Sequence, residues 1–148
     1  MLTQNLFNHC KNELTKKLKV LEARKRDLNQ NLFSGHKSSA GDKHETERAM
    51  IQLELEKLGE QIKNTEIHQQ ILCSIQKIEK SPSVRLGSVV LTNIANYYIS
   101  IAAGSCTLNS KTYYYISAQS PIGSLLLGKK VGDSIQFNNQ MVRIEEII

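Results

Sequence analysis

The first 80 residues contain no proline and carry an apolar side chain at every seventh position over one long stretch. Phe7, Leu14, Leu21 and Leu28 follow this spacing, which places their side chains on one stripe of a helix. A second stripe runs through Ile51, Leu55, Leu58, Ile62, Ile67, Ile71, Ile75 and Ile78, with a break in phase after Ile62. The pattern predicts two helices of roughly 30 residues, each about 45 Å long at ~1.5 Å per residue.

Residues 33–42, with the sequence FSGHKSSAGD, separate the two stripes and are rich in Gly and Ser. This composition predicts a turn. A connection this short forces the two helices to run antiparallel. Residues 1–80 are therefore predicted to form an antiparallel helical hairpin (coiled coil), with its tip near residues 34–45.

The pattern changes after Pro82, because a residue that precedes proline is disfavoured in a helix. Short segments rich in β-branched and aromatic residues follow, and turn residues bound them; they are residues 87–94, 96–103, 111–118, 133–138 and 141–148. They predict about five strands. Between the third and fourth segments, Ser120 is predicted to cap a short helix, with Pro121 at its first position and Gly128 at its end. The predicted fold class is α+β, with a small antiparallel β domain and one short helix over residues 81–148.

Composition excludes several classes of protein. Of the 148 residues, 22% are charged and 40% hydrophobic, which is typical of a folded, soluble chain. No apolar run approaches the ~18 residues that span a bilayer, and the first residues lack the apolar core of a signal peptide. Three widely spaced cysteines, Cys10, Cys73 and Cys106, argue against a disulfide framework or a zinc ribbon. We expect a cytoplasmic protein with no membrane partner.

Positive charge is concentrated in the first segment. The chain has a net charge of +5, and residues 1–37 carry eight Lys or Arg and three acids. The bases of interest are Lys16, Lys17, Lys19, Arg24, Lys25 and Arg26. They are either a solvated helix face or a basic patch that lies along a nucleic-acid backbone, with salt-dependent affinity. No aromatic residue lies among them, so stacking on bases is not expected.

Asp42 and Glu45 stand three residues apart at the start of the second predicted helix, a spacing that places both carboxylates on one face. One interpretation is a capping box, with Asp42 as the N-cap. The other is a pair of ligands for a hard divalent cation such as Mg²⁺, which would need further ligands from a partner. The sequence contains no P-loop, nucleophile elbow or glycine-rich dinucleotide turn, so it does not indicate an enzyme that acts alone.

All five tyrosines fall within residues 97–115. Consecutive residues of a strand point to opposite faces of a sheet, so Tyr113, Tyr114 and Tyr115 are predicted to alternate between its two faces. Core packing is the favoured role for the inward rings, and an exposed binding platform is the alternative for the others.

The layout resembles the bacterial Gre transcript-cleavage factors over nearly the full chain. Residues 120–133, SPIGSLLLGKKVGD, are similar to the family's pattern of Ser-Pro, a small-residue turn, a Leu-rich helical turn and Gly-Lys-x-Val-Gly-Asp. The family carries Gly-Asp-x-x-Glu-Asn at the hairpin tip, and Gly41, Asp42 and Glu45 stand in those places here. The resemblance implies that the β domain is FKBP-like.

The resemblance also implies a mechanism. Gre factors insert their hairpin into the secondary channel of RNA polymerase, where Asp42 and Glu45 would help to hold a second Mg²⁺ and to position the attacking water. The polymerase then cleaves the backtracked nascent RNA near its 3′ end, so the factor is an accessory and not an enzyme. The basic residues would lie near the extruded RNA, and DNA would be contacted only indirectly. Docking on the polymerase would use Ser120, Pro121, Gly128, Lys129, Lys130 and Asp133.

The sequence departs from the family pattern beyond Glu45. Thr46, Arg48 and Ala49 stand where the family has asparagine, a further acid and an aromatic residue. Three alternatives therefore stay open. The chain could be a Gre-fold regulator or inhibitor of RNA polymerase without cleavage activity, or a structural coiled-coil adaptor. It could also be a peptidyl-prolyl isomerase, which only fold analogy suggests.

Overall fold

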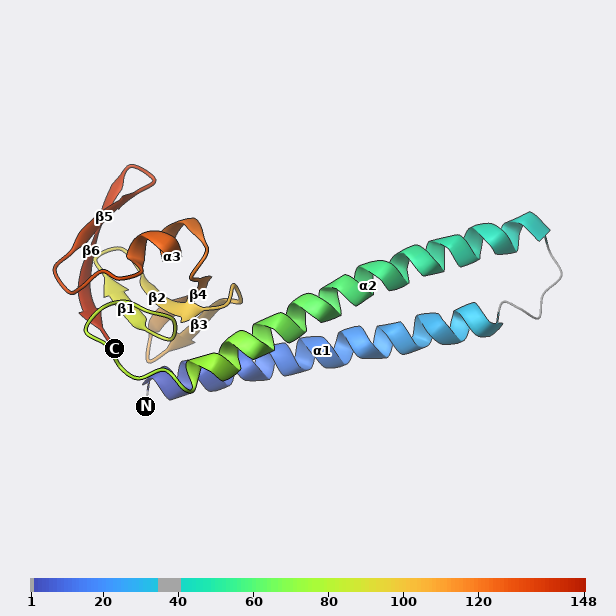
Figure 1. Ribbon diagram of the computed structural model, residues 1–148, viewed down its shortest axis with the longest axis horizontal. Coiled ribbons are helices and arrows are strands. Elements are labelled where there is room, and N and C mark those ends of the chain that lie inside the picture. Colours follow the sequence, from blue (N-terminus) through green and yellow to red (C-terminus); the bar gives the residue numbers. More distant parts are fainter. Residues whose placement is uncertain (1, 35–40) are drawn as a thin grey trace. The chain divides into compact units, whose positions relative to one another are not determined.

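The computed structural model describes residues 2–34 and 41–148, and the side chains of residues 2–33 and 45–148. Two long helices come first, α1 (Leu2–Ser34) and α2 (Gly41–Ile75), as predicted (Figure 1). A mixed sheet with a short helix, α3 (Pro121–Leu126), follows. The strands are β1 (Val89–Thr92), β2 (Asn96–Ser100), β3 (Gly104–Leu108), β4 (Lys111–Ser117), β5 (Ser134–Phe137) and β6 (Gln140–Ile147). The fold class is α+β.

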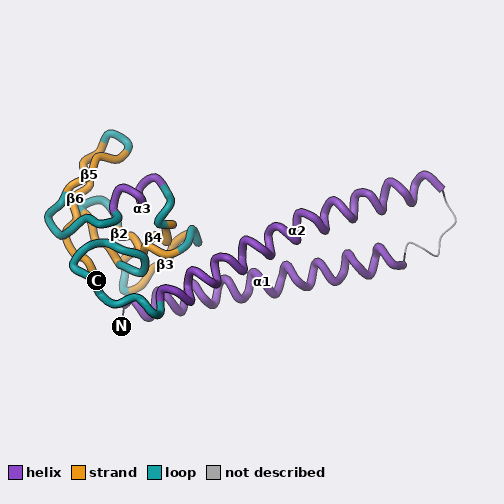
Figure 2. The backbone as a smooth tube through the Cα atoms, viewed as in Figure 1, coloured by secondary structure: helices purple, strands orange, loops and turns teal. Residues whose placement is uncertain are grey.

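The chain divides into two compact units, and the division falls inside both long helices. The first unit holds the start of α1 as far as Lys11 together with Gln70–Ile148, and the second holds Asn12–Gln69. Figure 2 shows that the first unit contains every strand and the second only helix among its described residues. The sheet unit therefore includes the first turns of α1 and the last turns of α2.

The buried stripe of α2 explains the break in phase after Ile62. Leu58 and Thr65 are 6% and 2% exposed, whereas Ile67 is 43% exposed. Thr65 Oγ1 donates a hydrogen bond to the carbonyl oxygen of Gln61 at 2.8 Å, which satisfies its hydroxyl inside the stripe. The prediction that Ile67 belongs to the stripe is wrong, because a polar residue occupies the buried position and the stripe continues in phase to Leu72.

The sheet has six strands in the order β3-β4-β2-β1-β6-β5, not about five, and it is mixed rather than antiparallel. The pair β2 and β4 is parallel, with Tyr97 opposite Tyr114 and Ile99 opposite Ile116. From β2 the chain passes beyond the position of β4 to the edge strand β3, and a tight turn then returns it as β4. Residues 101–110 thus make the crossover that a parallel pair requires.

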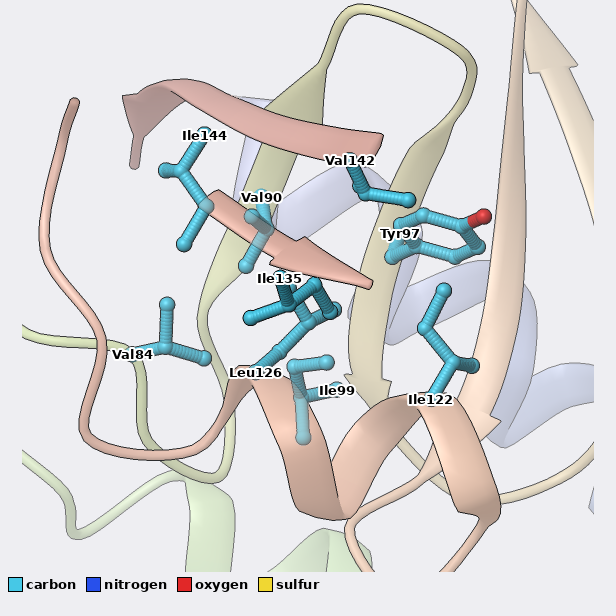
Figure 3. Packing of buried hydrophobic residues seen from close by; sticks show 9 residues of the cluster. All are labelled: Val84, Val90, Tyr97, Ile99, Ile122, Leu126, Ile135, Val142 and Ile144. Atoms are coloured by element: carbon cyan, nitrogen blue, oxygen red, sulfur yellow. The ribbon is translucent and has the colours of Figure 1, made fainter. Parts of the chain in front are cut away.

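Both faces of the sheet are covered within the first unit. On one face, Val90, Tyr97 and Ile99 pack against Ile122 and Leu126 of α3 in a buried cluster (Figure 3). Tyr115 faces the opposite side, where its hydroxyl donates a hydrogen bond to the carbonyl oxygen of Leu6 at 3.1 Å. The sheet therefore lies between α3 and the first turns of α1.

The turn between β3 and β4 carries two residues in the left-handed region, Asn109 (φ 50°) and Ser110 (φ 65°). Two such residues are the requirement of a type I′ hairpin turn. Asparagine tolerates this region, but serine is strained there.

Replacing Ser110 with glycine is expected to raise the free energy of unfolding of the sheet unit by about 0.5–1 kcal/mol, because glycine enters the left-handed region without a Cβ clash. Near-ultraviolet circular dichroism of the tyrosines during urea denaturation measures this change. The matched control is Ser105→Gly in β3, which should destabilise because an extended strand gains nothing from glycine. Stabilisation by both variants, or by neither, would contradict the turn assignment.

Candidate functional site

The acidic pair predicted as metal ligands lies at the beginning of α2. The helix starts at Gly41, so Asp42 and Glu45 are both within its first two turns and three residues apart, close to one face. The Glu45 side chain is exposed, whereas the side chain of Asp42 lies outside the described residues. Arg48, the departure from the family pattern that stands three residues beyond Glu45, is half-buried and has an interaction of its own within the structure.

A hard cation such as Mg²⁺ takes about six oxygen ligands and is often held by one or two carboxylates with waters and phosphates. Among the residues whose side chains are described, no three His, Cys, Asp or Glu side chains come together as a metal site. Two carboxylates on one helix face fit a partial ligand set. The remaining ligands would have to come from a partner's phosphates or carboxylates.

The six basic residues of α1 are all exposed, and the helix distributes them around its surface. Lys17 and Arg24 are seven residues apart and share one side of α1, as do Lys19 and Arg26 on another side, because seven residues make almost two full turns. The two pairs point in nearly opposite directions, since Lys17 and Lys19 are two residues apart. Lys16 and Lys25 point to the sides between these two pairs, so the bases are distributed around α1 rather than gathered in one continuous patch.

Two of these bases form exposed ion pairs. Arg24 Nη2 lies 3.3 Å from Glu54 Oε2 of α2, with side chains 60% and 49% exposed, and Lys16 Nζ lies 3.6 Å from Glu13 Oε1. Such pairs contribute about 0–1 kcal/mol to stability, so a phosphate can replace the carboxylate at little cost. Lys17 lies near His68, whose pKa is lowered by burial and, to a smaller extent, by the lysine charge.

The segment of residues 120–133 is shaped by its own polar groups. Ser120 caps α3, since its Oγ accepts a hydrogen bond from the Gly123 N–H at 3.1 Å, and Pro121 is the first helical residue. Gly128, at φ 80°, follows the end of the helix. Asp133 Oδ2 accepts a hydrogen bond from the Lys130 N–H at 2.8 Å. The predicted cap and helix end are confirmed. Ser120, Gly128 and Asp133 therefore each stabilise the local backbone of this segment.

The exposed part of this segment has an apolar component that the sequence reasoning missed. Leu125, Leu127 and Val131 are 41%, 38% and 57% exposed, beside the exposed Lys129 and Lys130. The run of three leucines in the sequence could have indicated this surface, because a short helix with one buried face can bury only some of them. Leu126 is the one that is fully buried. The surface offered to a partner is therefore mixed apolar and basic.

The tyrosines divide between the core and the surface as the alternation predicted. Tyr113 and Tyr115 are 4% and 3% exposed, and Tyr114 is 45% exposed. His9 stacks on Tyr115, with ring centroids 5.8 Å apart and its Nδ1 3.0 Å from the tyrosine hydroxyl. His9 therefore has a structural role in joining α1 to the sheet.

A cavity of about 220 Å³ opens in the sheet unit, where Phe7, Ile75, Leu86 and Tyr98 are among its lining residues. None of the residues predicted as functional lines it. No helix in the described part of the chain is long and apolar enough to cross a membrane.

No family model matches the sequence, and a search of curated proteins found no match.

Proposed function

We propose that the chain is a Gre-like transcription factor that enters the secondary channel of RNA polymerase and stimulates cleavage of backtracked transcripts. The observation that carries the proposal is the arrangement of α1 and α2, which are 33 and 35 residues long, with Asp42 and Glu45 at the start of the second. At ~1.5 Å per residue each helix is about 50 Å long, enough to carry acids deep into a partner. The finer fold that accompanies this function is an antiparallel hairpin and an FKBP-like β domain.

In this function Asp42 and Glu45 donate carboxylate oxygens to a Mg²⁺ ion that the polymerase also holds. Bound there, the ion would supply Lewis-acid activation of the water that attacks the RNA. The exposed Glu45 carboxylate can also accept a hydrogen bond from that water and orient it. The reaction centre belongs to the polymerase, so the factor acts as an accessory in the cytoplasm.

The other predicted surfaces have matching tasks. The exposed bases of α1 would lie near the extruded nascent RNA, where Arg24 and Lys16 would exchange a carboxylate for a phosphate. The mixed apolar and basic surface of residues 120–133 would dock on the polymerase, with Val131 and Leu125 as apolar contacts. DNA is contacted only through the polymerase.

Transcript cleavage in backtracked elongation complexes tests the proposal. Wild-type protein is expected to shorten the RNA from its 3′ end, and Asp42→Asn or Glu45→Gln is expected to reduce the rate at least 100-fold while binding to polymerase persists. The matched control is Glu47→Gln, because Glu47 is an exposed acid of the same helix on a different face.

Binding without any cleavage by the wild-type protein would favour the regulator or inhibitor without cleavage activity. The specific observation behind that second candidate is the half-buried Arg48, which places a positive charge one turn beyond Glu45. If the protein does not bind polymerase at all, the result would favour the alternative that it is a structural coiled-coil adaptor.

A further inference from the structure

The helical unit, Asn12–Gln69, buries few of its apolar side chains. Among its described residues the buried ones are Leu14, Leu58 and Thr65, whereas Val20, Met50, Leu53 and Ile67 are exposed by 67%, 65%, 53% and 43%. Scattered exposed apolar residues are normal on a protein surface, but a contiguous group marks an interaction site. These four side chains would form such a site if they share one face of the unit.

Their spacing and contacts place them on one side of the unit, here named the apolar flank (Val20, Met50, Leu53 and Ile67). Met50 and Leu53 line a shallow groove together with Glu54 and Lys57. Ile67 lies two heptads after Leu53 and returns near the same face of α2. On α1, Val20 is one turn from Arg24, which forms the ion pair with Glu54.

The charges on this flank are self-complementary. Arg24 and Glu54 are side by side and 60% and 49% exposed. In a two-fold symmetric contact, a residue i of one copy that contacts residue j of the other implies a second, identical contact. In that second contact, residue j of the first copy contacts residue i of the second. An arginine and a glutamate on one patch can therefore exchange partners between two copies and form two ion pairs across the axis.

The area fits a weak dimer. Residues 50–67 of α2 extend about 27 Å, and two adjacent helices are about 20 Å wide. The flank therefore offers roughly 500 Å² per copy and about 1,000 Å² in total, at the low end for specific interfaces. We propose that the apolar flank is the contact surface of a homodimer, in which two copies bury Val20, Met50, Leu53 and Ile67 against each other across a two-fold axis. This inference does not rest on the proposed function, because the molecular mass of the protein in solution tests it without RNA polymerase.

Sedimentation equilibrium of the full chain over a wide micromolar range, at physiological salt, tests the dimer. The wild-type protein is expected to pass from monomer to dimer as concentration rises, and Leu53→Glu to weaken the association constant at least tenfold. The matched control is Gln52→Glu, which adds the same charge at the neighbouring exposed position on another face, and it should associate as the wild type does. Circular dichroism at 222 nm checks that both variants keep their helices.

Exchange of charges tests the two-fold axis separately. Arg24→Glu and Glu54→Arg should each be largely monomeric alone, because like charges then face each other across the axis. Their equimolar mixture should form heterodimers, in which both cross-axis pairs are attractive again. A wild-type protein that stays monomeric over the range would overturn the proposal. So would equal dissociation of the Gln52→Glu and Leu53→Glu variants, or a mixture that remains monomeric.

Discussion

Replacing Gly123 with alanine is expected to lower the free energy of unfolding of the sheet unit by about 3 kcal/mol. A Cβ at this position would overlap the backbone carbonyl oxygen of Ser117 and lie 2.8 Å from Ser120 Oγ. The same Ser120 oxygen accepts the Gly123 N–H, so relief of the clash pulls apart the cap of α3. The helix would then withdraw Ile122 and Leu126 from the buried cluster that they share with the sheet.

The matched control for this prediction is the same substitution in α2. Gly59 has open space where a Cβ would be placed, so Gly59→Ala should stabilise the helix by about 1 kcal/mol through helix propensity alone. Near-ultraviolet circular dichroism follows the sheet unit, since all five tyrosines lie in residues 97–115, and the signal at 222 nm follows the helices. A Gly123→Ala protein as stable as the wild type would contradict the described packing of α3.

Removal of one hydroxyl from each of two buried tyrosines is expected to have opposite effects. The Tyr115 hydroxyl donates to the carbonyl oxygen of Leu6 and contacts His9 Nδ1 at 3.0 Å, so Tyr115→Phe should destabilise by about 1–2 kcal/mol. The Tyr98 hydroxyl is buried with no hydrogen-bond partner among the described residues. Tyr98→Phe should therefore be neutral or stabilising, because no bond is lost and a desolvated polar group is removed.

Thermal unfolding compares the stabilities of the two variants. A difference of at least 1 kcal/mol in their free energies of unfolding should separate their melting temperatures by roughly 2–4 °C. Alkaline pH gives a second readout. Burial, with a smaller contribution from Cys10, raises the pKa of Tyr98 from 10.0 to about 12, so the folded state holds this proton more tightly than the unfolded chain. Stability from Tyr98 is full below pH 10 and falls as pH rises toward 12. The fall between pH 10 and 12 should be smaller in Tyr98→Phe than in the wild-type protein, and an equal fall in these two proteins would contradict the burial of the Tyr98 hydroxyl.

Local patterns in the sequence predicted the helices well and the sheet topology less well. Heptad spacing located α1 and α2, and turn residues located α3 with its Ser120 cap, because neighbours along the chain decide these features. Strand β3 was missed, since its sequence GSCTL buries only Cys106 and gives little alternation. The parallel pairing of β2 with β4 depends on which distant strands meet, and no local signal encodes that choice.

The candidate site shows the same division. The positions of Asp42 and Glu45 on one helix followed from their spacing, and so did the alternation of Tyr113, Tyr114 and Tyr115. The distribution of the α1 bases around the helix follows from helical geometry and not from their order, because a dense run of charges looks like one patch in the sequence. The ion pair of Arg24 with Glu54 joins residues 30 apart, and only the tertiary structure reveals it.

The dependence of transcript cleavage on Mg²⁺ concentration tests the central claim most directly, because it reports whether the acids at the start of α2 supply metal ligands. We predict that wild-type protein lowers the Mg²⁺ concentration needed for half-maximal cleavage, and that Asp42→Asn or Glu45→Gln raises it again at least tenfold. The Glu47→Gln control should behave as the wild type. A Mg²⁺ requirement that is the same with and without the protein, or unchanged by both acid substitutions, would contradict the account.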